Sequence, residues 1–262
     1  MANDQNYTLG RGKLYFGRFA PGTMTPRGER YFGNTPEVNY TAEAEMLDHY
    51  GSDEGIRELD ASVPLQTNRT GNFTCDNIDL ENCALFWFGD KLTVTTTAAT
   101  GDTQTITVEP GLFYQLGASE AVPTGARNVS NVTAEMDPGG TPVSLTAGED
   151  FVVEEELGRI TFLADGPNSV TEGAEVEVTY DVAGSTQARV VSGNTPIEGA
   201  LRYISYNPEG EQQDYYFPRV KISPNGDFAL KGDDWQALPF NLQILKKPGM
   251  EAVYIDGRPQ TS

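Results

Sequence analysis

The sequence of 262 residues has little of what catalysis and metal binding require. It contains one histidine, His49, and two cysteines, Cys75 and Cys83. Two cysteines are too few for a disulfide framework, and without a second pair they do not make a zinc site. No GxSxG, HExxH or Cys/His cluster is present that would give the histidine a nucleophile or a metal to act with. We therefore predict that the protein is not an enzyme and has no cofactor.

Long hydrophobic segments are also missing. No run of about 18 apolar residues occurs, so we expect no membrane insertion. The first residues, MANDQNYTLGRG, contain no apolar stretch that would serve as a signal peptide. We expect a protein that is made in a reducing cytoplasm.

Basic residues are scarce. The chain holds 18 Lys and Arg against 38 Asp and Glu, a net charge of −20. Affinity for duplex DNA comes from Lys and Arg, so tight DNA binding is not expected. The acidic excess is uneven: 16 acids and 8 bases in residues 1–110, 13 and 3 in residues 111–189, and 9 and 7 in residues 190–262. Half of the excess therefore lies in the middle third.

Two stretches with a period of two dominate the rest. From Glu37 to Glu45 and from Val63 to Thr74, apolar and polar residues alternate, which is typical of strands with one buried face and one wet face. The polar faces consist of Glu37, Asn39, Thr41, Glu43 and Glu45 on the first strand and Gln66, Asn68, Thr70, Asn72 and Thr74 on the second.

The polar, acidic segment between these strands, Met46 to Ser62, is predicted to be a long loop. Loops of this length are usually functional or ordered by a partner. Its residues of interest are Met46, Asp48, His49, Tyr50, Asp53, Glu54, Ile56, Arg57 and Leu59.

One helix is expected after the second strand. Asp79 is a candidate N-cap, Gly89 is a candidate C-cap, and apolar residues recur between them at helical spacing. The remaining segments have β character, with 28 Gly and 16 Pro supplying turns. We predict an all-β fold with one short helix. Residues 1–110 and 190–262 would form one domain, and residues 111–189 an inserted small β module.

Two blocks of the sequence resemble a known family. The run from Glu29 to Gly89, ERYFGNTPEVNYTAEAEMLDHYGSDEGIRELDASVPLQTNRTGNFTCDNIDLENCALFWFG, resembles the N-terminal half of the major tail tube proteins of long-tailed bacteriophages. The run from Ala200 to Leu245, ALRYISYNPEGEQQDYYFPRVKISPNGDFALKGDDWQALPFNLQIL, is similar to their C-terminal half. The middle module departs from the minimal family pattern and looks like small β modules of other phage tail proteins.

The resemblance implies a structural protein of the virion tail that is assembled in the host cytoplasm. Six copies would form a ring, and stacked rings would form a tube with an inner β-barrel. The ten polar strand residues would face the lumen, and the Met46–Ser62 loop would reach a neighbouring ring. The implied partners are further copies of the chain, the tape-measure protein in the lumen, tail terminator and distal tail proteins at the ends, and double-stranded DNA in passage.

Other interpretations remain open at this point. The acidic segment 111–189 is compatible with a β-sandwich adhesin or a calcium-dependent binding module, although no DxDxDG frame is present. A glycan-cleaving enzyme would need a framed pair of carboxylates, which the sequence lacks. The inner tube of a contractile injection system is a related structural alternative.

Overall fold

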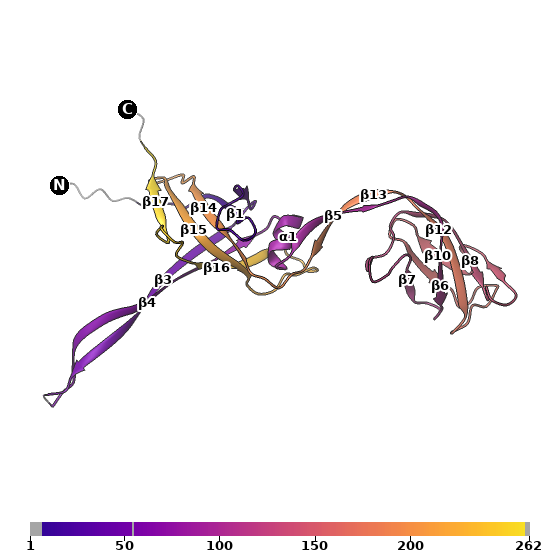
Figure 1. Cartoon of the computed structure of the whole chain (residues 1–262), viewed down its shortest axis with the longest axis horizontal. Helices are drawn as coiled ribbons and strands as arrows, with labels where there is room; N and C mark the ends of the chain where they lie inside the picture. Colours follow the sequence, from indigo (N-terminus) through magenta and orange to yellow (C-terminus); the bar gives the residue numbers. More distant parts are fainter. Residues whose placement is uncertain (1–6, 54, 260–262) are drawn as a thin grey trace. The chain divides into compact units, whose positions relative to one another are not determined.

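The computed structural model describes residues 7–53 and 55–259. The described chain is almost entirely β, with α1 (Leu80–Phe86) as its one α-helix. This confirms the predicted all-β fold with one short helix. The chain divides into two units, Met1–Leu92 with Arg189–Ser262, and Thr93–Ala188 (Figure 1).

Unit 1 is built on one large antiparallel sheet. The strand order is β2-β1-β14-β15-β16-β4-β3, and β17 pairs with β15 beside β16. The strands are β1 (Gly12–Arg18), β2 (Arg30–Tyr31), β3 (Glu37–Gly51), β4 (Glu58–Cys75), β14 (Ile197–Ser205), β15 (Gln213–Pro224), β16 (Leu238–Ile244) and β17 (Tyr254–Gly257).

The core of unit 1 lies between this sheet and α1. Phe73 on β4 and Phe240 on β16 are buried and stack with their ring centroids 5.0 Å apart. Phe86 of α1 packs edge-on against Phe240 at 6.0 Å. The helix therefore covers the apolar side of the central strands, and burial of these rings is the main force that holds it there.

The ends of α1 only partly follow the sequence prediction. Asp79 is the N-cap, with its carboxylate accepting a 2.7 Å hydrogen bond from the Asn82 N–H. Gly89 is not the C-cap: Trp87 is, and Phe88 takes the left-handed conformation (φ 53°). Gly89 is required for another reason, since a Cβ there would lie 1.9 Å from the Val191 carbonyl oxygen.

Unit 2 is a β-sandwich with its own core. A four-stranded sheet, β6-β12-β8-β9, packs against a three-stranded sheet, β10-β11-β7, through buried residues of both. The strands are β6 (Ala99–Thr107), β7 (Phe113–Gln115), β8 (Val129–Met136), β9 (Val143–Leu145), β10 (Phe151–Glu154), β11 (Arg159–Phe162) and β12 (Glu175–Val182).

The boundary of the module differs from the expected one at its N-terminal side. The module was predicted to span residues 111–189, whereas the compact unit begins at Thr93. The reason is that β6 pairs along its length with β12, from Glu175↔Thr107 to Val182↔Ala99. β5 (Asp90–Thr96) and β13 (Ser185–Val191) form a two-stranded ribbon of their own at the boundary.

Candidate assembly surface

The ten polar residues predicted on two strand faces lie on one face of the β3–β4 hairpin. Each residue of one strand directly opposes a residue of the other. The opposed pairs are Glu37↔Thr74, Asn39↔Asn72, Thr41↔Thr70, Glu43↔Asn68 and Glu45↔Gln66. All are exposed except Thr74, which is half-buried. The period-two pattern predicts which residues share a face of each strand, and the strand pairing sets which of them stand opposite one another.

Hydrogen bonds link the amides on this polar face. The Asn39 side chain donates to the Glu37 carboxylate at 2.8 Å and to the Asn72 side-chain oxygen at 3.1 Å. Gln66 donates to Asn68 at 2.9 Å. The face carries the carboxylates of Glu37, Glu43 and Glu45 and no Lys or Arg, so its charge is wholly negative at neutral pH.

The opposite face anchors the base of the hairpin to the sheet. Val38 opposes the buried Phe73, and the ring of Tyr40 stacks on Phe217 with centroids 4.7 Å apart. Gly71, opposite Tyr40, leaves room for that ring, because a Cβ there would lie 2.6 Å from the Asn39 carbonyl oxygen and 2.9 Å from the ring. The apolar face predicted from the alternation is therefore buried only at this end.

The prediction of a long loop from Met46 to Ser62 is wrong, because most of this segment belongs to β3 and β4. β3 and β4 stay paired as far as Gly51↔Glu58, with register shifts at Glu45/Met46 and His49/Tyr50. Among the predicted loop residues, Met46, Asp48, His49 and Tyr50 belong to β3 and Leu59 belongs to β4; Asp53, Ile56 and Arg57 lie in the tip; Glu54 lies outside the described residues. The alternation fades here because neither face of this part of the hairpin is buried.

Among the described residues, no third strand pairs with the outer part of the hairpin. β16 pairs with β4 only up to Gln243↔Thr70. Beyond that point the hairpin exposes large apolar side chains, including the opposed pair Leu47 and Val63 at 58% and 55%. An isolated two-stranded ribbon is marginally stable in water, and exposed apolar patches of this kind mark interaction surfaces.

His49 lies on the outer part of the hairpin, in β3. It is 73% exposed and paired with Asp60 across the hairpin. Across residues 7–53 and 55–259, no three His, Cys, Asp or Glu residues gather in a way that could hold a metal ion. No helix in that part of the chain is long and apolar enough to cross a membrane.

Unit 1 has a second feature, a pocket lined by basic side chains, that the sequence pattern does not predict. Arg18, Arg27, Arg30 and Lys91 line one pocket beside α1. One signal was available: five of the eight bases in residues 1–110 lie between Arg11 and Arg30. These arginines and Lys91 line the same pocket only because of the way the sheet and α1 are arranged, and this arrangement cannot be inferred from the spacing of residues in the sequence.

Fold and surface together define a two-unit, all-β protein with a long unsupported hairpin at the edge of its main sheet. The chain belongs to a family described as "Protein of unknown function UCP028589", whose model matches residues 7–252. A search of curated proteins found no match.

Proposed function

We propose that the chain is a structural subunit of a bacteriophage tail tube, which assembles into stacked hexameric rings. The observation that carries the proposal is the polar face of the hairpin, with ten side chains in directly opposed pairs. Six such faces turned inward would make an acidic wall. Carboxylates on that wall repel phosphates, so double-stranded DNA would pass without binding.

The sheet edge supports the same proposal. β3 is the outermost strand in the sheet order, and it is 15 residues long. A long exposed edge is a template for pairing with another chain, and closure into a barrel removes it. In the proposed tube, strands of neighbouring copies cover this edge.

In this function the protein has no reaction to catalyse. Its partners are further copies of itself, the tape-measure protein in the lumen during assembly, and tail terminator and distal tail proteins at the ends. The tube is part of the virion tail and is assembled in the cytoplasm of the host.

Electron microscopy of the purified protein and a lumen variant test the proposal. We expect stacked sixfold rings for the wild-type chain. In phage carrying Glu43→Lys with Glu45→Lys, we expect tubes to assemble and DNA ejection to slow by roughly tenfold or more, because lysines bind phosphate.

The matched control is Glu155→Lys with Glu156→Lys, which makes the same charge change on exposed residues of unit 2. We expect normal ejection from this control. Normal ejection from the Glu43/Glu45 variant would remove the lumen assignment, and a chain that stays monomeric under all conditions would remove the tube itself.

A further inference from the structure

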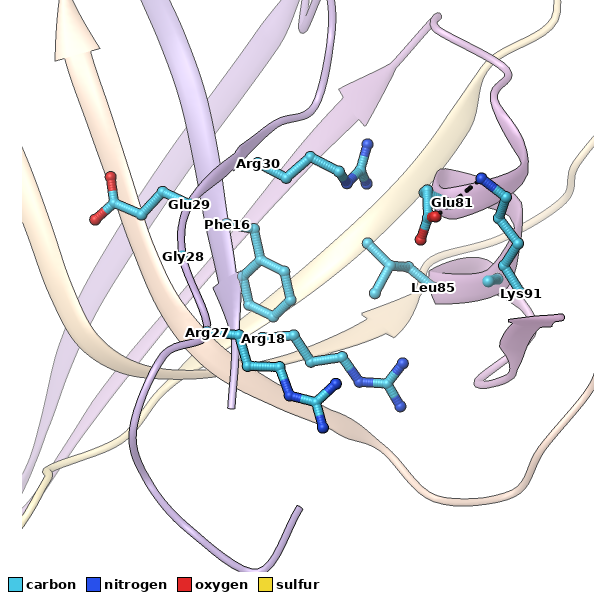
Figure 2. Close-up of a pocket in the computed structure, with 10 residues that line it drawn as sticks. Phe16, Arg18, Arg27, Gly28, Glu29, Arg30, Glu81, Leu85 and Lys91 are labelled. Atoms are coloured by element: carbon cyan, nitrogen blue, oxygen red, sulfur yellow. Dashed lines mark ion pairs between the residues drawn. The ribbon is translucent and has the colours of Figure 1, made fainter. Parts of the chain in front are cut away.

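A basic pocket with an apolar floor lies beside α1 in unit 1 (Figure 2). Its volume is about 300 Å³. The floor is formed by Phe16 of β1 and by Ala84 and Leu85 of α1, all of which are largely buried. The pocket therefore offers an apolar side chain a place to insert.

The rim of this pocket has a basic excess, because four cations line it, Arg18, Arg27, Arg30 and Lys91, against the carboxylates of Glu29 and Glu81. Arg18 forms a 2.8 Å ion pair with Asp90, and Lys91 forms one of 3.1 Å with Glu81. Both pairs are exposed, and exposed pairs contribute little and exchange readily. Figure 2 shows the side chains of Arg18 and Arg27 running in the same direction.

Arg27 is the exception on this rim. Its side chain is exposed and has no ion-pair or hydrogen-bond partner among residues 7–53 and 55–259. In a chain of net charge −20, an unpaired arginine beside an apolar pocket is suited to an incoming carboxylate.

The tip of the β3–β4 hairpin carries the complementary chemistry. Ile56 at the tip is 78% exposed. Asp53 and Glu58 flank it, exposed and without an ion pair in the described structure, whereas Asp60 is held by His49. The tip also carries Arg57, whose guanidinium lies 5.6 Å from the centroid of the Tyr50 ring. The tip thus presents one apolar side chain with two carboxylates nearby, those of Asp53 and Glu58, that form no ion pair in the described structure.

The tip cannot fill the pocket of its own chain. The supported part of β4 ends at Thr70, and Glu58 lies twelve residues further along the strand. At about 3.3 Å per residue, this places the tip roughly 40 Å beyond the sheet. In Figure 1 the hairpin extends away from α1.

We propose that the hairpin tip of a second copy docks in this pocket, with Ile56 on the apolar floor and Asp53 and Glu58 on the Arg27 side of the rim. The proposal rests on the tail tube function and names the receptor for the hairpin. Tip and pocket are different surfaces of one chain, so the contact is heterologous and repeats from copy to copy. Such repetition produces rings or open stacks.

Charge reversal tests the contact. We expect Arg27→Glu alone and Glu58→Arg alone each to weaken self-association, measured by sedimentation velocity, by at least about tenfold, since each variant places like charges against one another at the contact. Mixing the two variants restores complementary charge at every contact between unlike copies. We therefore expect the mixture to recover association and tubes in electron micrographs.

Lys231→Glu is the matched control, because Lys231 is exposed outside the pocket and its substitution makes the same charge change as Arg27→Glu. We expect it to associate like the wild type. Circular dichroism of each variant confirms that it is folded.

The outcomes separate the two proposals. Tubes from the wild type that form equally well with Arg27→Glu would overturn the docking and leave the tail tube function standing. A mixture that fails to recover would also overturn the docking. A wild-type chain that stays monomeric at every concentration would overturn both proposals.

Discussion

At the residue scale, the thiol of Cys75 is shielded within unit 1. The side chain is fully buried, with its sulfur 3.2 Å from the Phe32 carbonyl oxygen. Asn82, also buried, donates a 3.3 Å hydrogen bond to the sulfur and a 2.8 Å bond to the same carbonyl. These contacts tie the start of α1 to the end of β4.

This burial predicts a pH dependence. The pKa of Cys75 is raised to about 11, chiefly by desolvation; the nearby Asp76 and Asp79 also raise it, whereas a hydrogen bond from the Asn77 backbone and the charge of Arg30 oppose the rise. The folded state thus holds its proton more tightly than the unfolded chain. The resulting stability is fully present below the unfolded pKa, near pH 9, and is lost as the pH rises toward 11.

We expect Cys75→Ser to lose this dependence. Between pH 9 and 11, the free energy of unfolding of the wild type should fall relative to the variant by up to about 1.4 kcal/mol per pH unit. Urea unfolding of both proteins across this range measures the difference. Cys83→Ser is the control, since Cys83 is only half-buried and should give a smaller slope. A difference that does not vary with pH would contradict the account.

At the element scale, we expect the outer hairpin to be needed for assembly and to contribute little to the stability of the fold. Of the described residues beyond the Glu45↔Gln66 pair, all but the half-buried Gly51 are exposed, and none of them pairs with a third strand. Replacing Met46–Leu65 by Asn-Gly would join that pair through a two-residue turn. We expect the unfolding free energy to change by less than about 0.5 kcal/mol, because no buried contact is lost.

Assembly should respond very differently to this shortening. Without the tip and the exposed apolar pairs, we expect a folded protein that forms no stacked tubes. Denaturant unfolding and electron microscopy of the same sample measure both effects. Tubes of normal length from the shortened chain would show that the outer hairpin has no role in stacking.

The hairpin also shows what the sequence could predict. Residues 37–45 and 63–74 are predicted as strands because burial at the base imposes alternation, whereas the opposition of Glu43 to Asn68 depends on the pairing register, which alternation does not give. The extension through Met46 and Leu59 was missed because backbone hydrogen bonds hold it, and these bonds leave no side-chain signature. The basic pocket was missed because Arg27 and Lys91 meet only through the packing of α1 on the sheet.

At the scale of the whole molecule, the two units have separate cores. The buried cluster around Phe240 in unit 1 and the one around Phe162 in unit 2 share no residue. β5 and β13 carry the chain out of unit 1 and back. Because the chain enters and leaves unit 2 through two paired strands, unit 2 can be removed by joining those strands with a turn.

We therefore predict that unit 2 is dispensable for the tube. Replacing residues 97–184 by Asn-Gly would connect the end of β5 to the start of β13. The polar face of the hairpin, the open β3 edge and the Arg27 pocket all belong to unit 1 and remain. We expect stacked rings of unchanged symmetry and a smaller outer diameter in electron micrographs, as the acidic module would lie outside the tube.

Calorimetry supplies the control, because the full chain should unfold in two transitions and the shortened chain should keep only the one of unit 1. A shortened chain that keeps this transition and forms no rings would show that unit 2 takes part in the subunit contacts.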